Sequence, residues 1–151
     1  MFLKSSGKFL VVAIIIFFIS CKKDDTGTID TGILQLSSVK VANDVFDLTA
    51  GASNTQVPVD MPFLITFTMA IDTHTVADAV LISAAGNSLP IKFSYQNQNK
   101  TISAKPLVNL ANNTNYQLQI TGALLGAQKE TYPGITINFT TIQGSFNILS
   151  I

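Results

Sequence analysis

One histidine and one cysteine are the residues of this 151-residue chain whose types best suit nucleophilic catalysis. A nucleophile needs a base within hydrogen-bond reach, and His74 is the only histidine available for that role. It lies between Thr73 and Thr75, in a polar stretch typical of a solvated turn. No G-x-S-x-G sequence, which marks the exposed serine of many hydrolases, accompanies it. The sequence therefore favours a protein that is not an enzyme.

Three carboxylates, those of Asp60, Asp72 and Asp78, flank one expected strand, where loops could bring two of them together around calcium. Their spacing matches no calcium-binding loop, and acids are common at turns and helix starts because they bond the local backbone. Cys21 and His74 cannot supply the four ligands of structural zinc. No glycine-rich phosphate loop occurs either, so we expect neither a metal nor a cofactor.

Cys21 follows a charged and then an apolar segment. Lys4 and Lys8 lie in the first eight residues without an acid, and residues 9–19 are apolar without interruption. These eleven residues would span roughly 16 Å as a helix, about half of a ~30 Å hydrocarbon layer. A cleaved leader therefore fits better than a transmembrane helix, and a retained helix is the alternative.

The residues Phe18-Ile19-Ser20-Cys21 resemble the lipobox of bacterial lipoproteins, in which a small residue precedes an invariant cysteine. The resemblance implies that residues 1–20 are removed and that Cys21 is lipidated on sulfur and becomes the new N-terminus. Phe18 stands where the pattern favours leucine. Several acyl chains hold a domain at a membrane persistently, since each buried methylene contributes ~0.8 kcal/mol. The membrane is thus an expected partner.

The next four residues look like the lysine-plus-two-acids signal that directs some Gram-negative lipoproteins to the outer face of the outer membrane. They are Lys22, Lys23, Asp24 and Asp25, and the alternative is a solvated linker. Residues 21–32 as a whole predict a lipidated cysteine and a flexible tether. We expect a lipid-anchored protein of the cell envelope, at the outer membrane, on either its periplasmic or its surface face.

The composition argues against nucleic acid as a partner. Nine lysines balance nine acids and arginine is absent, so the chain has neither a net positive charge nor a guanidinium fork for phosphate. Charged residues make up only 12% of the chain, a balance more usual for extracellular β-proteins than for cytosolic enzymes. With a single cysteine, the fold has no internal disulfide.

Residues 33–143 predict one all-β domain, because short apolar runs alternate with period two between turn residues. The clearest run places Phe63, Ile65, Phe67 and Met69 on one face. The only plausible helix, from 75 to 79, is about one turn long. About seven short strands without disulfides predict an Ig-like antiparallel β-sandwich. The expected strand segments are 33–39, 45–48, 63–69, 80–82, 91–95, 101–104, 116–120 and 135–139, and residues 144–151 form a C-terminal tail.

The order of these segments resembles a bacterial Ig-like domain of the kind found in S-layer and other surface proteins. Residues 57–68 resemble the opening turn and strand of that family, and 69–76 its short loop before a one-turn helix. Leu110 to Tyr116 is similar to its Leu-x-x-x-Thr-x-Tyr corner, and 137–141 to its closing Phe-Thr-Thr strand. The match covers roughly residues 35–141. It implies a spacer, a stacking module or an adhesion or glycan-binding accessory.

We expect most of the phenylalanines to lie in the core and some of the tyrosines to be exposed. For Tyr116 we expect either a corner tyrosine, whose hydroxyl reaches an upstream backbone group, or an ordinary core residue. Tyr95 and Tyr132 are the exposed candidates, too few to predict a platform for stacking sugars. The residues expected to form the structural core are Phe63, Ile65, Phe67, Tyr116 and Phe139.

The preferred hypothesis is a non-catalytic, membrane-anchored Ig-like lipoprotein that acts as a structural, adhesion or ligand-presenting module at the cell envelope. A protein or a glycan would be its ligand. The second hypothesis is a polysaccharide-binding surface lipoprotein of a nutrient-uptake system, and the third is an unrecognised hydrolase that uses His74 or a serine. Fold alone does not choose among them.

Overall fold

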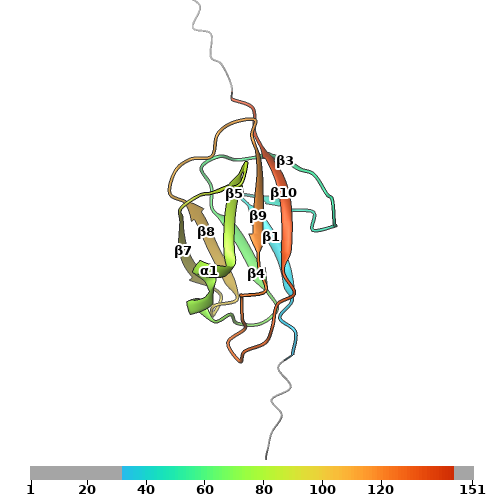
Figure 1. Ribbon diagram of the computed structural model, residues 1–151, viewed down its shortest axis with the longest axis vertical. Helices are drawn as coiled ribbons and strands as arrows, with labels where there is room; N and C mark the ends of the chain where they lie inside the picture. The colour runs from blue at the N-terminus through green and yellow to red at the C-terminus, as the bar shows by residue number, and fades with distance from the viewer. Residues whose placement is uncertain (1–31, 145–151) are drawn as a thin grey trace, which may run out of the picture.

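Residues 32–144 form two five-stranded β-sheets packed face to face in the computed structural model, which describes this part of the chain (Figure 1). The leader, Cys21, the segment from Lys22 to Asp25 and the tail from residue 145 onward lie outside the described residues. Between residues 32 and 144, no helix is long and apolar enough to cross a bilayer.

The first sheet has the strand order β2-β1-β4-β8-β7, and every neighbouring pair is antiparallel. It is the paler layer behind the other sheet in Figure 1. Its strands are β1 (Leu36–Val41), β2 (Asp44–Val45), β4 (Phe63–Phe67), β7 (Ile91–Gln96) and β8 (Thr101–Pro106).

The second sheet has the order β3-β10-β9-β5-β6 and lies in front in Figure 1. Three of its pairs are antiparallel, whereas β3 runs parallel to β10. Its strands are β3 (Asn54–Val57), β5 (Val80–Ala84), β6 (Asn87–Ser88), β9 (Asn115–Ile120) and β10 (Ile135–Thr141).

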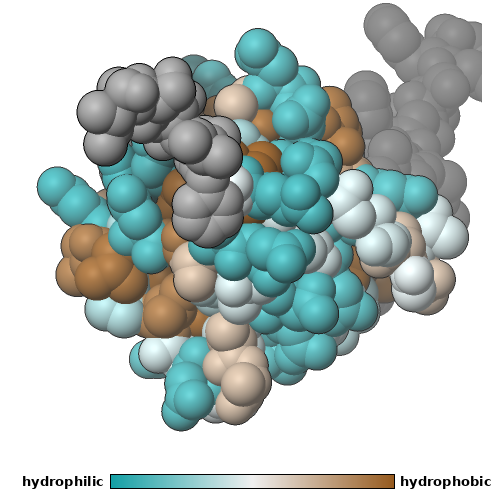
Figure 2. All heavy atoms as spheres, turned by 90° about the horizontal axis from the view of Figure 1, so that it is seen from above, coloured by the Kyte–Doolittle hydropathy of each residue, from teal (hydrophilic) through white to brown (hydrophobic). Residues whose placement is uncertain are grey.

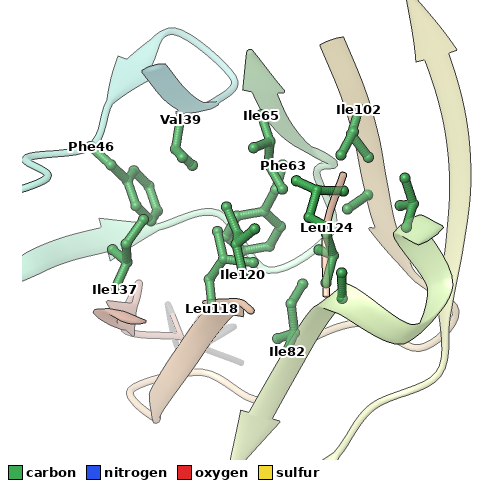
Figure 3. Close-up of a cluster of buried hydrophobic side chains, with 14 of the residues drawn as sticks. Val39, Phe46, Phe63, Ile65, Ile82, Ile102, Leu118, Ile120, Leu124 and Ile137 are labelled. Carbon is green, nitrogen blue, oxygen red and sulfur yellow. The ribbon is translucent and has the colours of Figure 1, made fainter. Parts of the chain in front are cut away.

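The core lies between the sheets and is built from alternate residues of the central strands. Figure 3 shows side chains of the first sheet, such as Val39 and Ile65, pointing toward those of the second, such as Leu118 and Ile82. Fully burying a side chain of this size contributes about 1.5–3 kcal/mol. At one end of the core, three phenylalanine rings meet with centroids 5.1–5.9 Å apart: Phe46, Phe63 and Phe139.

The five residues assigned to the core from the sequence are all buried in the structure: Phe63, Ile65, Phe67, Tyr116 and Phe139. Met69 was expected on the same face as Phe67, but it is only half-buried. The reason is that β4 ends at Phe67, so the alternation of a strand no longer directs the side chain of Met69 inward.

A single helical turn carries the chain from the first sheet to the second. A 3-10 turn (Thr73–Thr75) runs into α1 (Val76–Ala79), as the sequence predicts for residues 75–79. The carboxylate of Asp72 accepts a hydrogen bond from the backbone N–H of His74 at 3.1 Å, which caps the turn. Val76 and Ala79 are buried, so the turn is held by the core.

The structure confirms the sandwich but corrects its strand inventory. Ten strands are present among the described residues, whereas about seven were expected, and the second sheet is mixed rather than antiparallel. The period-two pattern did not predict β3, because its buried residues, Asn54 and Val57, are three positions apart rather than two. Gln56 between them has a φ of 60° and the register with β10 shifts there, as in a β-bulge.

Two further expectations, one on a strand boundary and one on a loop tyrosine, are wrong. The first strand begins at Leu36 and not at Ile33, which is 65% exposed and makes only an isolated bridge to Thr131. Tyr132 was expected to be exposed, but it is 6% exposed and its ring meets that of Phe67 edge-on at 5.6 Å. The edge-to-face contact explains why this tyrosine lies inside.

The described chain enters and leaves the sandwich at opposite ends. Figure 1 shows residue 32 at the bottom of the molecule and residue 144 at the top. Seen from the top, the described surface is mainly hydrophilic or intermediate, with smaller hydrophobic patches between (Figure 2). The two ends of the described segment therefore lie on opposite sides of the sandwich.

Candidate functional site

A groove of about 500 Å³ lies on the outer face of the second sheet. Its floor is made by outward-facing side chains of two central strands, Asn115 and Gln117 of β9 and Asn138 and Thr140 of β10. Ser83 of β5 extends the floor toward β6. Its walls are the loop 51–53 on one side and the turn 85–86 on the other.

The floor residues are paired across the two strands. Gln117 faces Asn138 in the antiparallel register, and its side-chain amide donates to the Asn138 amide oxygen at 3.1 Å. Thr140 faces Asn115 and donates from its hydroxyl to the Asn115 amide oxygen at 2.6 Å. These contacts hold the side chains in place while leaving further amide hydrogens and lone pairs open.

The wall beside β10 is fixed by the buried side chain of Asn54. Its amide nitrogen donates to the carbonyls of Asp47 (3.2 Å) and Asn138 (3.3 Å), and its amide oxygen accepts from the Asp47 N–H at 2.8 Å. Hydrogen bonds from Thr49, first from its side chain and then from its backbone N–H, lower the pKa of the Asp47 carboxyl. Gly51, with a φ of 82°, turns the chain back.

The opposite wall is the tight turn between β5 and β6. Ala84 pairs with Asn87, which leaves Ala85 and Gly86 as a two-residue loop. Their φ angles of 47° and 80° are those of a type I′ turn, whose twist suits a β-hairpin. Both walls are thus set by short, hydrogen-bonded backbone.

The groove is uncharged, and its lining mixes polar and apolar surface in nearly equal parts. None of its lining residues carries a formal charge, and none belongs to the exposed large hydrophobic side chains of residues 32–144. Both β9 and β10 have strand neighbours on each side, so their backbone groups are engaged in the sheet. A ligand here would meet side-chain amides and hydroxyls.

The structure places the candidate residues for catalysis and calcium apart from this groove. His74 is exposed in the turn before α1, and Asp72 beside it accepts a hydrogen bond from the Lys129 ammonium at 2.6 Å. The contacts with Lys129 and with the His74 N–H lower the pKa of Asp72. No group of three potential metal-ligating side chains occurs between residues 32 and 144. Asp72 therefore serves the local backbone and one ion pair.

Tyr116 has the geometry of a corner tyrosine. Its ring is buried and stacks on Phe139, with centroids 5.5 Å apart and an interplanar angle of 17°. Its hydroxyl accepts a hydrogen bond from the Ala111 N–H at 2.9 Å, five residues upstream. The ring packs in the core while the hydroxyl holds the loop that leads into β9.

The sequence of residues 39–141 matches the profile of the bacterial Ig-like domain family. The chain belongs to that family. The match covers all the strands from Val39 to the end of β10, including the corner at Tyr116. No curated protein resembles this Ig-like chain in sequence at a significant level.

Solved structures share the fold of this Ig-like chain at low sequence identity. The N-terminal part of the bacterial S-layer protein SbsC aligns with a TM-score of 0.51 and 18% identity, over 73% of this chain and 24% of that one. Domains 1–6 of SbsC give 0.51 and 18%, over 77% and 15%. The α2-macroglobulin of Escherichia coli, spanning domains MG0-NIE-MG1, gives 0.51 and 10%, over 74% and 33%.

The Ig-like chain thus spans a third or less of each of these larger proteins. At such identities the likeness shows the fold alone.

The groove residues were missed by the sequence interpretation, which looked for histidines, acids and exposed aromatic rings. The available signal was the polar half of the period-two pattern: Asn115, Gln117 and Gln119 on β9 alternate with buried residues. This pattern identifies an outward face, but it does not show that loops rise on both sides of it.

Proposed function

We propose that this chain is a non-catalytic Ig-like module, held at the outer membrane of a bacterial cell by a lipid on Cys21. The observation that carries the proposal is that the described segment enters and leaves the sandwich at opposite ends (Figure 1). An anchor on the N-terminal side would hold that end near the membrane. The seven residues of β10 alone span roughly 23 Å, so the far end would project well beyond the lipid headgroups.

Two further observations support a structural or ligand-presenting role. The family match assigns the chain to bacterial Ig-like domains, and the S-layer protein SbsC contains domains of similar fold. The leader pattern that ends in Ser20-Cys21 supports lipidation and delivery to the cell envelope. The segment from Lys22 to Asp25 supports export to the cell surface.

The variant Cys21→Ser tests the anchor. Without the thiol no acyl chain can be attached, so we expect an unprocessed or soluble protein in place of one that partitions with the membrane fraction. Ser20→Gly is the matched control, because it keeps a small residue before the cysteine and should leave partitioning unchanged. Fractionation followed by immunoblotting measures both. Membrane attachment that survives Cys21→Ser would contradict the lipid anchor and favour a retained helix.

A double variant tests surface exposure separately from anchoring. Replacing Asp24 and Asp25 by asparagine should leave the protein in the membrane fraction but protect it from a protease added to intact cells. Equal digestion of the wild type and this variant would contradict the export signal. Protection of both would place the protein on the periplasmic face.

A further inference from the structure

The groove over β9 and β10 has a shape and chemistry that the spacer role does not use. Its floor crosses β9 and β10, between the loop 51–53 that precedes β3 and the turn 85–86 that joins β5 to β6. A linear molecule could lie along it over the floor. A volume of about 500 Å³ lies within the range of small-molecule binding sites.

The chemistry of the lining selects the class of ligand. Asn115, Gln117 and Asn138 each carry an amide that both donates and accepts, and Thr140 and Ser83 add hydroxyl groups. Without charged side chains the groove offers no ionic partner for a phosphate or a carboxylate. Neutral molecules that are rich in hydroxyl groups match this set of donors and acceptors.

An extended peptide fits the groove less well. Peptides commonly bind by adding a strand to a free sheet edge, whereas β9 and β10 are inner strands with partners on both sides. Peptide recognition also often uses charged side chains, and the lining has none.

We propose that this groove binds a neutral glycan chain through the amides of Gln117, Asn138 and Asn115. The inference goes beyond the spacer role and is independent of the lipid anchor, because it concerns only residues of the folded domain. No exposed aromatic ring lies in the groove to stack on a sugar, so binding is weak and depends on several chains or copies acting together.

NMR titration of the ¹⁵N-labelled full chain tests the proposal directly, since side-chain amides give their own signals. The probes are neutral hexasaccharides with glucose, xylose, mannose and galactose backbones, at millimolar concentration. We expect at least one probe to shift the side-chain signals of Gln117 and Asn138 in a saturable way. The amide of Gln119, which lies on the same face of β9 but outside the groove, should not move.

Variants complete the test. Gln117→Ala combined with Asn138→Ala removes two amides that bond each other, so no buried group loses a partner, and saccharide binding should weaken roughly tenfold or more. Gln119→Ala is the matched control and should bind within about twofold of the wild type. An unchanged melting temperature of the double variant verifies its fold.

Three results would overturn the proposal: no shift with any saccharide, shifts that map away from the groove, or equal binding by the double variant. A neutral hexapeptide of serine, threonine and asparagine that binds the same residues more tightly than every saccharide would also overturn it. None of these results would bear on the lipid anchor, which is tested by the cysteine variant.

Discussion

The hydroxyl of Tyr116 joins the core to the loop before β9 through one hydrogen bond. In Tyr116→Phe the Ala111 N–H loses its acceptor, so we expect the free energy of unfolding to fall by about 1 kcal/mol. Tyr132→Phe is the matched control, because Tyr132 is as buried as Tyr116 and its ring contact with Phe67 does not need the hydroxyl, and its effect should stay within about 0.5 kcal/mol. Urea denaturation measures both, and equal effects would contradict the corner role.

Tyr132 also makes stability depend on pH in the alkaline range. Burial raises its pKa from 10.0 to about 12, so the unfolded state ionises at a lower pH than the folded state. The stabilising contribution is complete below about pH 10 and is lost as the pH rises toward 12. We expect Tyr132→Phe to flatten the fall in melting temperature across this window. An identical fall in the variant would contradict the burial of this side chain.

At the scale of elements, the tight turn between β5 and β6 carries local strain. Ala85 has a φ of 47°, a conformation that costs an L-residue with a Cβ roughly 1–2 kcal/mol. Asparagine tolerates it better, so Ala85→Asn should raise the free energy of unfolding by about 0.5–1 kcal/mol. Ala85→Val should lower it by about 1 kcal/mol or more. Chemical denaturation measures this pair of variants, and a stabilising valine would contradict the turn geometry.

The sequence predicted the strands with a regular backbone and missed a strand with an irregular one. β9 alternates strictly between buried and exposed residues and β4 between buried and half-buried ones, so the period-two pattern identified both strands and the core side chains that they carry. β3 contains a bulge at Gln56 and buries the polar Asn54, so neither period nor hydrophobicity revealed it. Asn54 fixes the loop that forms one wall of the groove. Because the period-two pattern did not reveal Asn54, residue spacing alone could not locate the groove.

At the scale of the whole molecule, the proposed spacer role and the proposed glycan groove use different parts of the sandwich. The described segment enters and leaves the sandwich at opposite ends, which suits a module that holds something away from a membrane (Figure 1). The groove opens on the side, over β9 and β10, so a ligand there would leave both ends free. Such a module could present a glycan while it serves as a spacer.

Mass spectrometry of the mature protein from the membrane fraction tests the central claim most directly. We expect a polypeptide that begins at Cys21 and carries the added mass of acyl chains on that residue. Intact protein that still begins at Met1 and bears no acyl group would contradict the account.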